Sequence, residues 1–302
     1  MDEFIASRTA LATSLMRAVH TRLDPHPLID DPWGDRLVPD SARELFRESV
    51  LARMGIEARE KALTSPENIL DESLLRSRAY ANVVTRTRYA EDALQQAVAK
   101  GIKQYVLIGA GFDSFALRRP GFAQGLQIYE IDFPSTQGLK LQRIRECALT
   151  LPDSVHFIAA DLSKESVQDA LTRSSFCSDQ LTFFSWLGVS MYLTREANLA
   201  TFKSIAACAP EASQLVFTYF DERLFHQPSD SFREMEKRVA SMGEPFLSGF
   251  SPSLLTANLA DCGLALIEDL DGGEVAARYD RTGTRSLGQS SFSHIALARV
   301  AA

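Results

Sequence analysis

The chain shows one hydrophobic pattern before about residue 101 and another after it. Within residues 4–22, apolar side chains such as Leu11, Leu15 and Val19 recur at helical spacing. Residues 41–60 are also predicted to be helical, and residues 72–100 to form one long helix or two short ones that end at Gly101. The first hundred residues are therefore expected to be mainly helical.

Beyond Gly101, short apolar runs alternate with helix-like stretches. Strands are predicted at 104–109, 126–131, 155–159, 181–187 and 214–220, with helices near 135–150, 164–173 and 194–209. This alternation is typical of a parallel, doubly wound α/β sheet. Two further strands, 264–270 and 292–299, have only loop between them, so a C-terminal hairpin with one antiparallel strand is expected.

Composition narrows the class of protein. The 302 residues are 45% hydrophobic and carry a net charge of −7, which argues against a nucleic-acid-binding surface. The N-terminus lacks the pattern of a signal peptide, and the longest apolar run, 181–193, is too short to cross a bilayer. We therefore expect no membrane partner. The four cysteines are scattered and the five histidines are isolated, which predicts reduced thiols, a cytoplasmic location and no metal site.

A glycine turn follows the first predicted strand. The sequence Tyr105-Val-Leu-Ile-Gly109-Ala110-Gly111-Phe-Asp113-Ser114 runs from an apolar strand into residues that let the backbone approach a ligand closely. Glu130 and Asp132 end the next strand, 21 and 23 residues after Gly109, where a carboxylate can accept hydrogen bonds from ribose hydroxyls. The pair of strands predicts a site for an adenosine-containing cofactor.

The turn differs from a dinucleotide fingerprint, which needs a third glycine. Ser114 stands at that position, and Asp113 adds a negative charge at a place where a positive electrostatic field would be needed to bind a pyrophosphate. S-adenosyl-L-methionine has no phosphate and carries cationic groups, so it tolerates that carboxylate. An NAD(P)-dependent oxidoreductase is the alternative enzyme class.

The two motifs resemble the leucine carboxyl methyltransferase family, in its bacterial S-adenosyl-L-methionine-dependent branch, over about residue 7 to the C-terminus. The resemblance implies the class I methyltransferase fold, a Rossmann-like, mostly parallel sheet closed by an antiparallel hairpin. Residues 1–302 would form one methyltransferase domain. Within it, 1–100 would be a helical cap and 101–302 the cofactor-binding core, with a cap insertion near 221–250.

The family match also implies cofactor-binding residues. It gives Asp132 the ribose hydroxyls, although Glu130 lies one pleat earlier on the same strand face. It assigns Asp161 and Leu162 to the adenine, with a helix cap as the alternative role of Asp161. It gives Arg86 the carboxylate of the cofactor and Arg17 a further contact, while ordinary surface positions remain the alternative for both arginines. The predicted cofactor site is thus Arg17, Arg86, Gly109, Ala110, Gly111, Asp132, Asp161 and Leu162.

The end of the fourth strand departs from the family pattern. Leu187 stands where the family has a glutamate in a segment close to E-G-x-x-x-Y-L, which keeps open a catalytically degenerate, cofactor-binding scaffold. Trp186 and Tyr192 are candidates for the substrate pocket, with core packing as the alternative. No catalytic base stands out, which favours a carboxylate or an acidic hydroxyl as methyl acceptor. The sequence predicts O-methylation (EC 2.1.1.-) of a small molecule or peptide and leaves the oligomeric state open.

Overall fold

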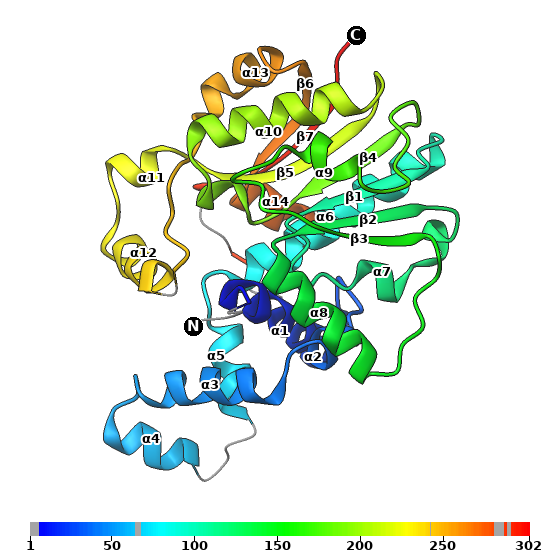
Figure 1. Cartoon of the computed structure of the whole chain (residues 1–302). Coiled ribbons are helices and arrows are strands. Elements are labelled where there is room, and N and C mark those ends of the chain that lie inside the picture. The colour runs from blue at the N-terminus through cyan, green and yellow to red at the C-terminus, as the bar shows by residue number, and fades with distance from the viewer. Residues whose placement is uncertain (1–5, 64–67, 242, 281–286, 289–290) are drawn as a thin grey trace.

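A seven-stranded sheet forms the centre of the molecule (Figure 1). The computed structural model describes residues 6–63, 68–241, 243–280, 287–288 and 291–302. The strands are β1 (Gln104–Ile108), β2 (Gln127–Asp132), β3 (Val155–Ala159), β4 (Thr182–Trp186), β5 (Gln214–Phe220), β6 (Leu264–Asp271) and β7 (Ser293–Val300). Their order is β3-β2-β1-β4-β5-β7-β6, and β7 runs antiparallel to both of its neighbours. The predicted mostly parallel sheet with an antiparallel C-terminal strand is confirmed.

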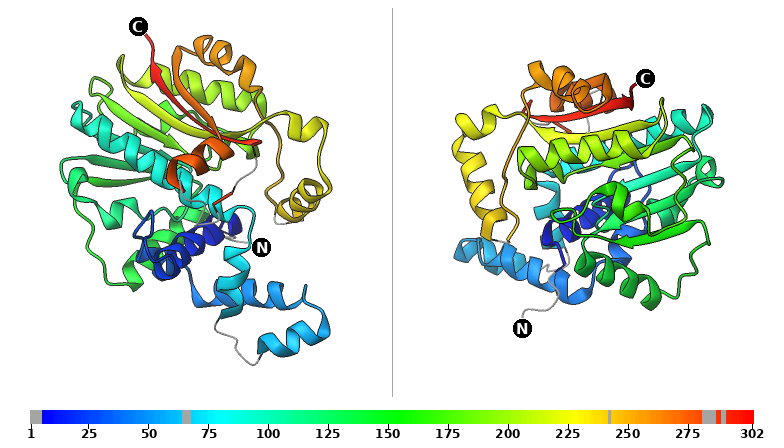
Figure 2. Two further views of the ribbon diagram at one scale, coloured as in Figure 1. Left: turned by 180° about the vertical axis from the view of Figure 1, so that it is seen from behind. Right: turned by 45° about the horizontal axis from the view of Figure 1, so that its top comes forward.

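Helices cover both faces of the sheet, which explains why β1 and β4 are buried along their whole length. One face packs on α6 (Tyr80–Ala99), α7 (Phe115–Arg118) and α14 (Gly272–Tyr279), with the short 3₁₀ turn η2 (Gly121–Ala123) beside them. The other packs on α9 (Val167–Leu171), α10 (Arg195–Cys208) and α13 (Pro252–Ala260). Figure 2 shows α6 and α14 in front of the sheet when it is seen from behind.

The N-terminal helices lie beside the β3 edge of the sheet and below it in Figure 1. They are α1 (Arg8–Leu23), α2 (Trp33–Arg36), α3 (Asp40–Leu51), α4 (Ile56–Leu63) and α5 (Ile69–Leu75). The single helix predicted for 41–60 is in fact two helices, α3 and α4, because α3 ends at Leu51 and a turn from Ala52 to Gly55 follows it. Of the two possibilities for 72–100, the structure has two helices, and the second, α6, packs on the sheet.

The connection between the last two strands corrects one expectation. Loop alone was predicted there, but α14 follows β6 directly. Asp271 caps this helix, and Glu274 returns a hydrogen bond to the Asp271 N–H, which forms a capping box. The Asp-x-x-Glu spacing was visible in the sequence. The segment 221–250 forms α11 (Arg223–His226) and α12 (Asp230–Ser241), which project from the sheet at the left of Figure 1.

Candidate functional site

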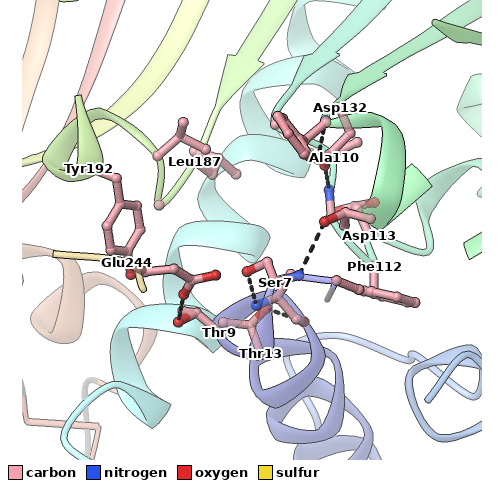
Figure 3. Close-up of a pocket in the computed structure, with 18 of the residues that line it drawn as sticks. Ser7, Thr9, Thr13, Ala110, Phe112, Asp113, Asp132, Leu187, Tyr192 and Glu244 are labelled. Carbon is pink, nitrogen blue, oxygen red and sulfur yellow. Dashed lines mark hydrogen bonds between the residues drawn. The ribbon is translucent and has the colours of Figure 1, made fainter. Parts of the chain in front are cut away.

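A cavity of about 590 Å³ opens at the carboxyl ends of β1, β2 and β4. Six stretches line it: the start of α1, the middle of α6, the turn after β1, the start of α8 (Pro134–Glu146), the segment after β4 and the segment after α12. Parallel α/β sheets bind ligands at this edge. The cavity is therefore the candidate site (Figure 3).

The glycine turn forms one wall. Gly109 and Gly111 have φ angles of +66° and +51°, in the left-handed region that glycine tolerates best. A Cβ on Gly109 would lie 2.5 Å from Cγ2 of Val189, so that position excludes any larger residue. The N–H groups of Gly109 and Ala110 both donate to the carbonyl of Ile131, at 2.9 and 3.1 Å. The turn is thereby tied to β2, with its open side toward the cavity.

Asp132 lies at the junction of the two strands. One carboxylate oxygen accepts a hydrogen bond from the N–H of Gly111, and the other accepts from the N–H of Phe133 at 2.6 Å. Burial raises the pKa of Asp132, although these two N–H donors oppose the rise. A carboxylate oxygen has more than one lone pair, so Asp132 can still accept from a ligand.

Glu130 is not among the residues that line the cavity. It is buried in an ion pair with Lys140 of α8, which is equally buried. Burial raises the pKa of Glu130 to about 7, and the charge of Lys140 limits that rise. The geometry thus favours Asp132 over Glu130 for any ligand contact, because only Asp132 faces the cavity.

Arg86 reaches the cavity from α6. A Cβ on Gly188 would lie 2.6–2.8 Å from its guanidinium atoms, so the arginine packs directly on that glycine. Its hydrogen bond is to Oδ1 of Asn82, at 3.2 Å, and no carboxylate within the described part of the chain forms an ion pair with it. Burial lowers the pKa of Arg86 to about 10, which leaves it charged at neutral pH. The site therefore offers an unpaired cation to an anionic ligand.

Arg17 also lines the cavity, but its guanidinium is already engaged. Its Nε pairs with Asp31 at 2.8 Å, and its Nη2 donates to the carbonyl of Phe112 at 2.6 Å. Burial would raise the pKa of Asp31, but the charge of Arg17 holds it below its usual value. Arg17 thus anchors α1 to the glycine turn, and any contact with a cofactor remains a prediction.

Three side chains meet at the far end of the cavity from the glycine turn (Figure 3). Thr9 donates a hydrogen bond to Glu244, and Tyr192 lies beside both. Burial and the charge of Glu244 raise the pKa of Tyr192 to about 12. Tyr192 was a predicted pocket residue and does line the cavity. Glu244 and Thr9 were not predicted, because neither belongs to a recognisable motif.

Three predicted residues do not line the cavity: Asp161, Leu162 and Trp186. Asp161 accepts hydrogen bonds from the N–H and hydroxyl of Ser163 and pairs with Lys164, while Ser166 caps α9. The helix-cap alternative for Asp161 is therefore wrong. Trp186 is fully buried against Phe202, in agreement with the core alternative.

Other kinds of site find no support in the described residues. No group of three or more histidine, cysteine or acidic side chains among them is arranged to hold a metal ion. Nor does that part of the chain contain a helix whose length and apolar character would let it cross a membrane.

Comparison with known proteins gives a consistent result. The family model for leucine carboxyl methyltransferase matches residues 10–206. The chain is 33% identical over 277 residues to YktD of Bacillus subtilis (strain 168), provisionally named an S-adenosyl-L-methionine-dependent methyltransferase; the match covers 89% of this chain and 90% of that protein. A protein of Mycobacterium avium (strain 104) with the same provisional description is 29% identical over 77% of this chain and 76% of its own.

Solved structures support the fold. A provisionally named methyltransferase from Thermobifida fusca YX matches with a TM-score of 0.58 and 12% identity, over 96% of this chain and 94% of its own. A family DUF574 protein from Streptomyces avermitilis MA-4680 gives a TM-score of 0.54 at 16% identity, over 76% and 90% of the two chains. With the sheet order, the glycine turn and the extent of the family match, these findings show that the chain belongs to the leucine carboxyl methyltransferase family.

Proposed function

We propose that this S-adenosyl-L-methionine-dependent methyltransferase transfers a methyl group to an oxygen, either a carboxylate or a hydroxyl, of a small molecule or peptide. The observation that carries the cofactor site is Arg86, which has no ion-pair partner among the described residues and faces the same cavity as the glycine turn and Asp132. The oxygen acceptor is supported by the match to the leucine carboxyl methyltransferase model. S-adenosyl-L-methionine has a ribose, which Asp132 could bind, and a free carboxylate, which Arg86 could bind.

The residues present fit that cofactor. Gly109 and Gly111 let the backbone come close, and Asp132 has lone pairs left for the ribose hydroxyls. A planar guanidinium such as that of Arg86 can form two parallel hydrogen bonds to a carboxylate. For Asp161 and Leu162 we retain the adenine contact that the family resemblance implies.

Catalysis then rests mainly on position. When bound, the cofactor supplies a methyl group on a positively charged sulfur. The protein has to hold the acceptor oxygen in line with that methyl, and such positioning can supply most of the acceleration. We further propose that residues 1–100 and 221–250 include the cap that excludes water. In support, α1 and the segment after α12 both line the cavity, and burial together with the charge of nearby Arg53 lowers the pKa of Arg238 on α12.

Calorimetry tests the proposal directly. The protein should bind S-adenosylmethionine and its demethylated product, S-adenosylhomocysteine, and should bind NAD weakly or not at all. Binding of NAD alone would refute the cofactor assignment and favour an oxidoreductase. Binding of S-adenosylmethionine without methyl transfer to any component of an extract of the native host would instead favour the scaffold that Leu187 keeps open.

A further inference from the structure

Glu244 is a carboxylate in the cavity that none of the proposed cofactor contacts uses. It comes from the segment after α12, outside the sheet, and it lies across the cavity from Ala110 and Asp132 (Figure 3). This inference rests on the proposed function, because it concerns the second substrate of the same site.

One side-chain hydrogen bond holds the carboxylate, and two backbone hydrogen bonds hold the segment that carries it. Thr9 of α1 donates a hydrogen bond to it, and its own N–H donates to the carbonyl of Val239 at 3.1 Å. The N–H of Leu247, three residues on, donates to the carbonyl of Met191 at 2.7 Å, which ties the segment to the 3₁₀ turn η3 (Ser190–Tyr192). Thr9 occupies only part of the lone-pair capacity of this carboxyl group, so Glu244 can accept a further hydrogen bond from a ligand.

The ammonium of the cofactor is the competing partner for Glu244. Another carboxylate is better placed for that cation, because Asp113 lies on the glycine turn itself and lines the cavity. One of its oxygens accepts from the N–H of Phe115 at 2.7 Å, and its charge acts on Arg86. An amino acid group held between Asp113 and Arg86 would leave Glu244 facing the acceptor.

The mouth of the cavity is apolar. Phe133 and Leu247 line it, and each is 51% exposed, so both side chains are accessible to a bound molecule. Phe246 also packs on Tyr192, with ring centroids 5.5 Å apart. These surfaces fit a molecule with an apolar body and one polar group directed at Glu244.

We propose that Glu244 is the general base of the reaction and that the acceptor is an apolar compound that reacts through a hydroxyl group rather than a carboxylate. The acceptor oxygen forms the new bond to the methyl carbon, the bond between carbon and sulfur breaks, and its electron pair stays on sulfur. The hydroxyl proton passes to the Glu244 carboxylate and from there to water. A carboxylate acceptor would need no base, and the like charge of Glu244 would repel it.

Binding measurements separate the two roles of Glu244. We expect the Glu244→Gln protein to bind S-adenosylhomocysteine and methylthioadenosine as tightly as the wild type does, which also shows that it is folded. Methylthioadenosine lacks both the amino and the carboxyl group. If the variant loses affinity for S-adenosylhomocysteine but keeps it for methylthioadenosine, Glu244 holds the ammonium and the proposal is wrong.

Methyl transfer tests the acceptor class. The protein is incubated with methyl-labelled S-adenosylmethionine and an extract of the native host, and the labelled product is treated with alkali. A methyl ether keeps its label, whereas a methyl ester releases it as volatile methanol. With the acceptor isolated in this way, Glu244→Gln should be about 10²- to 10⁴-fold slower, while the control Glu234→Gln, on the exposed side of α12, should match the wild type.

Each result has one meaning. An alkali-stable label together with a slow Glu244→Gln variant supports the proposal. An alkali-labile label, or full activity in Glu244→Gln, overturns it while leaving the methyltransferase assignment intact. No labelled product at all, from a protein that binds the cofactor, refutes the proposed methyl transfer itself, and the role of Glu244 falls with it.

Discussion

Replacement of Arg86 should change the stability and the cofactor affinity of the protein in opposite directions. Methionine is the suitable replacement, because it keeps most of the length that packs on Gly188 and removes the charge. Burial lowers the pKa of Arg86 to about 10, so folding disfavours the charged form, and this penalty applies in full at every pH below about 10. It corresponds to at most about 3 kcal/mol, since part of the side chain stays open to the cavity.

In the cofactor-free protein, Arg86→Met should therefore leave the Tm unchanged or raise it by a few degrees, at about 2–4 °C per kcal/mol for a chain of this size. Affinity for S-adenosylhomocysteine should fall. Loss of a buried, hydrogen-bonded charge pair costs about 2–5 kcal/mol, which is at least about 30-fold in Kd. Scanning calorimetry and titration calorimetry on the same preparations would measure both effects.

Methylthioadenosine and a neighbouring arginine supply the controls. The affinity for methylthioadenosine should change little, because it has no carboxylate to pair with Arg86. Arg88→Met, two residues along the same helix, should leave both ligands unaffected, since Arg88 pairs with Asp92 outside the cavity. Equal losses for both ligands, or a marked fall in the Tm of Arg86→Met, would show that Arg86 organises the structure instead of binding the cofactor.

Four further changes have distinct expected outcomes. Burial raises the pKa of Asp132, so the affinity for S-adenosylhomocysteine should fall on acidification, starting above the pH at which an ordinary aspartate protonates. In titration calorimetry, the Asp132→Asn protein should bind this ligand about 1–3 kcal/mol more weakly and should lose the pH dependence. Asp161→Asn should weaken methylthioadenosine and S-adenosylhomocysteine alike, whereas a lower Tm with unchanged affinity would reduce Asp161 to a turn residue. Gly188→Ala should lower both Tm and cofactor affinity, because its φ is +71° and the new Cβ would meet Arg86, while Gly121→Ala has open space and should change neither. Glu130→Gln should lower the free energy of unfolding by about 3–5 kcal/mol, and with it the Tm, since it breaks a buried ion pair; the cofactor affinity of the protein that remains folded should not change.

The sequence predicted those parts of the molecule that local pattern determines. The central strands are short apolar runs buried on both faces, so their positions and parallel arrangement could be read directly. The glycine turn and Asp132 were also visible, because both follow from strand ends and a fixed spacing. The break after α3 was missed because a single turn at Ala52 interrupts an otherwise helical stretch.

The acceptor side of the site could not be read in this way. Thr9 and Glu244 are 235 positions apart and meet only through the packing of α1 against the segment after α12. Trp186 is adjacent to Leu187, yet only Leu187 faces the cavity, because neighbouring residues at a strand end point in different directions. Such placements depend on tertiary structure, so no motif with a fixed spacing marks them in the sequence.

The position of β7 has a consequence for how the protein can be made and handled. This strand follows the other six in the chain, yet it is an interior strand that hydrogen-bonds to β5 on one side and β6 on the other. While the chain is being synthesised, both of those strands present unpaired edges until β7 emerges, and exposed edges invite association with other chains. Loss of β7 would therefore divide the sheet, because β6 would have no strand left to pair with.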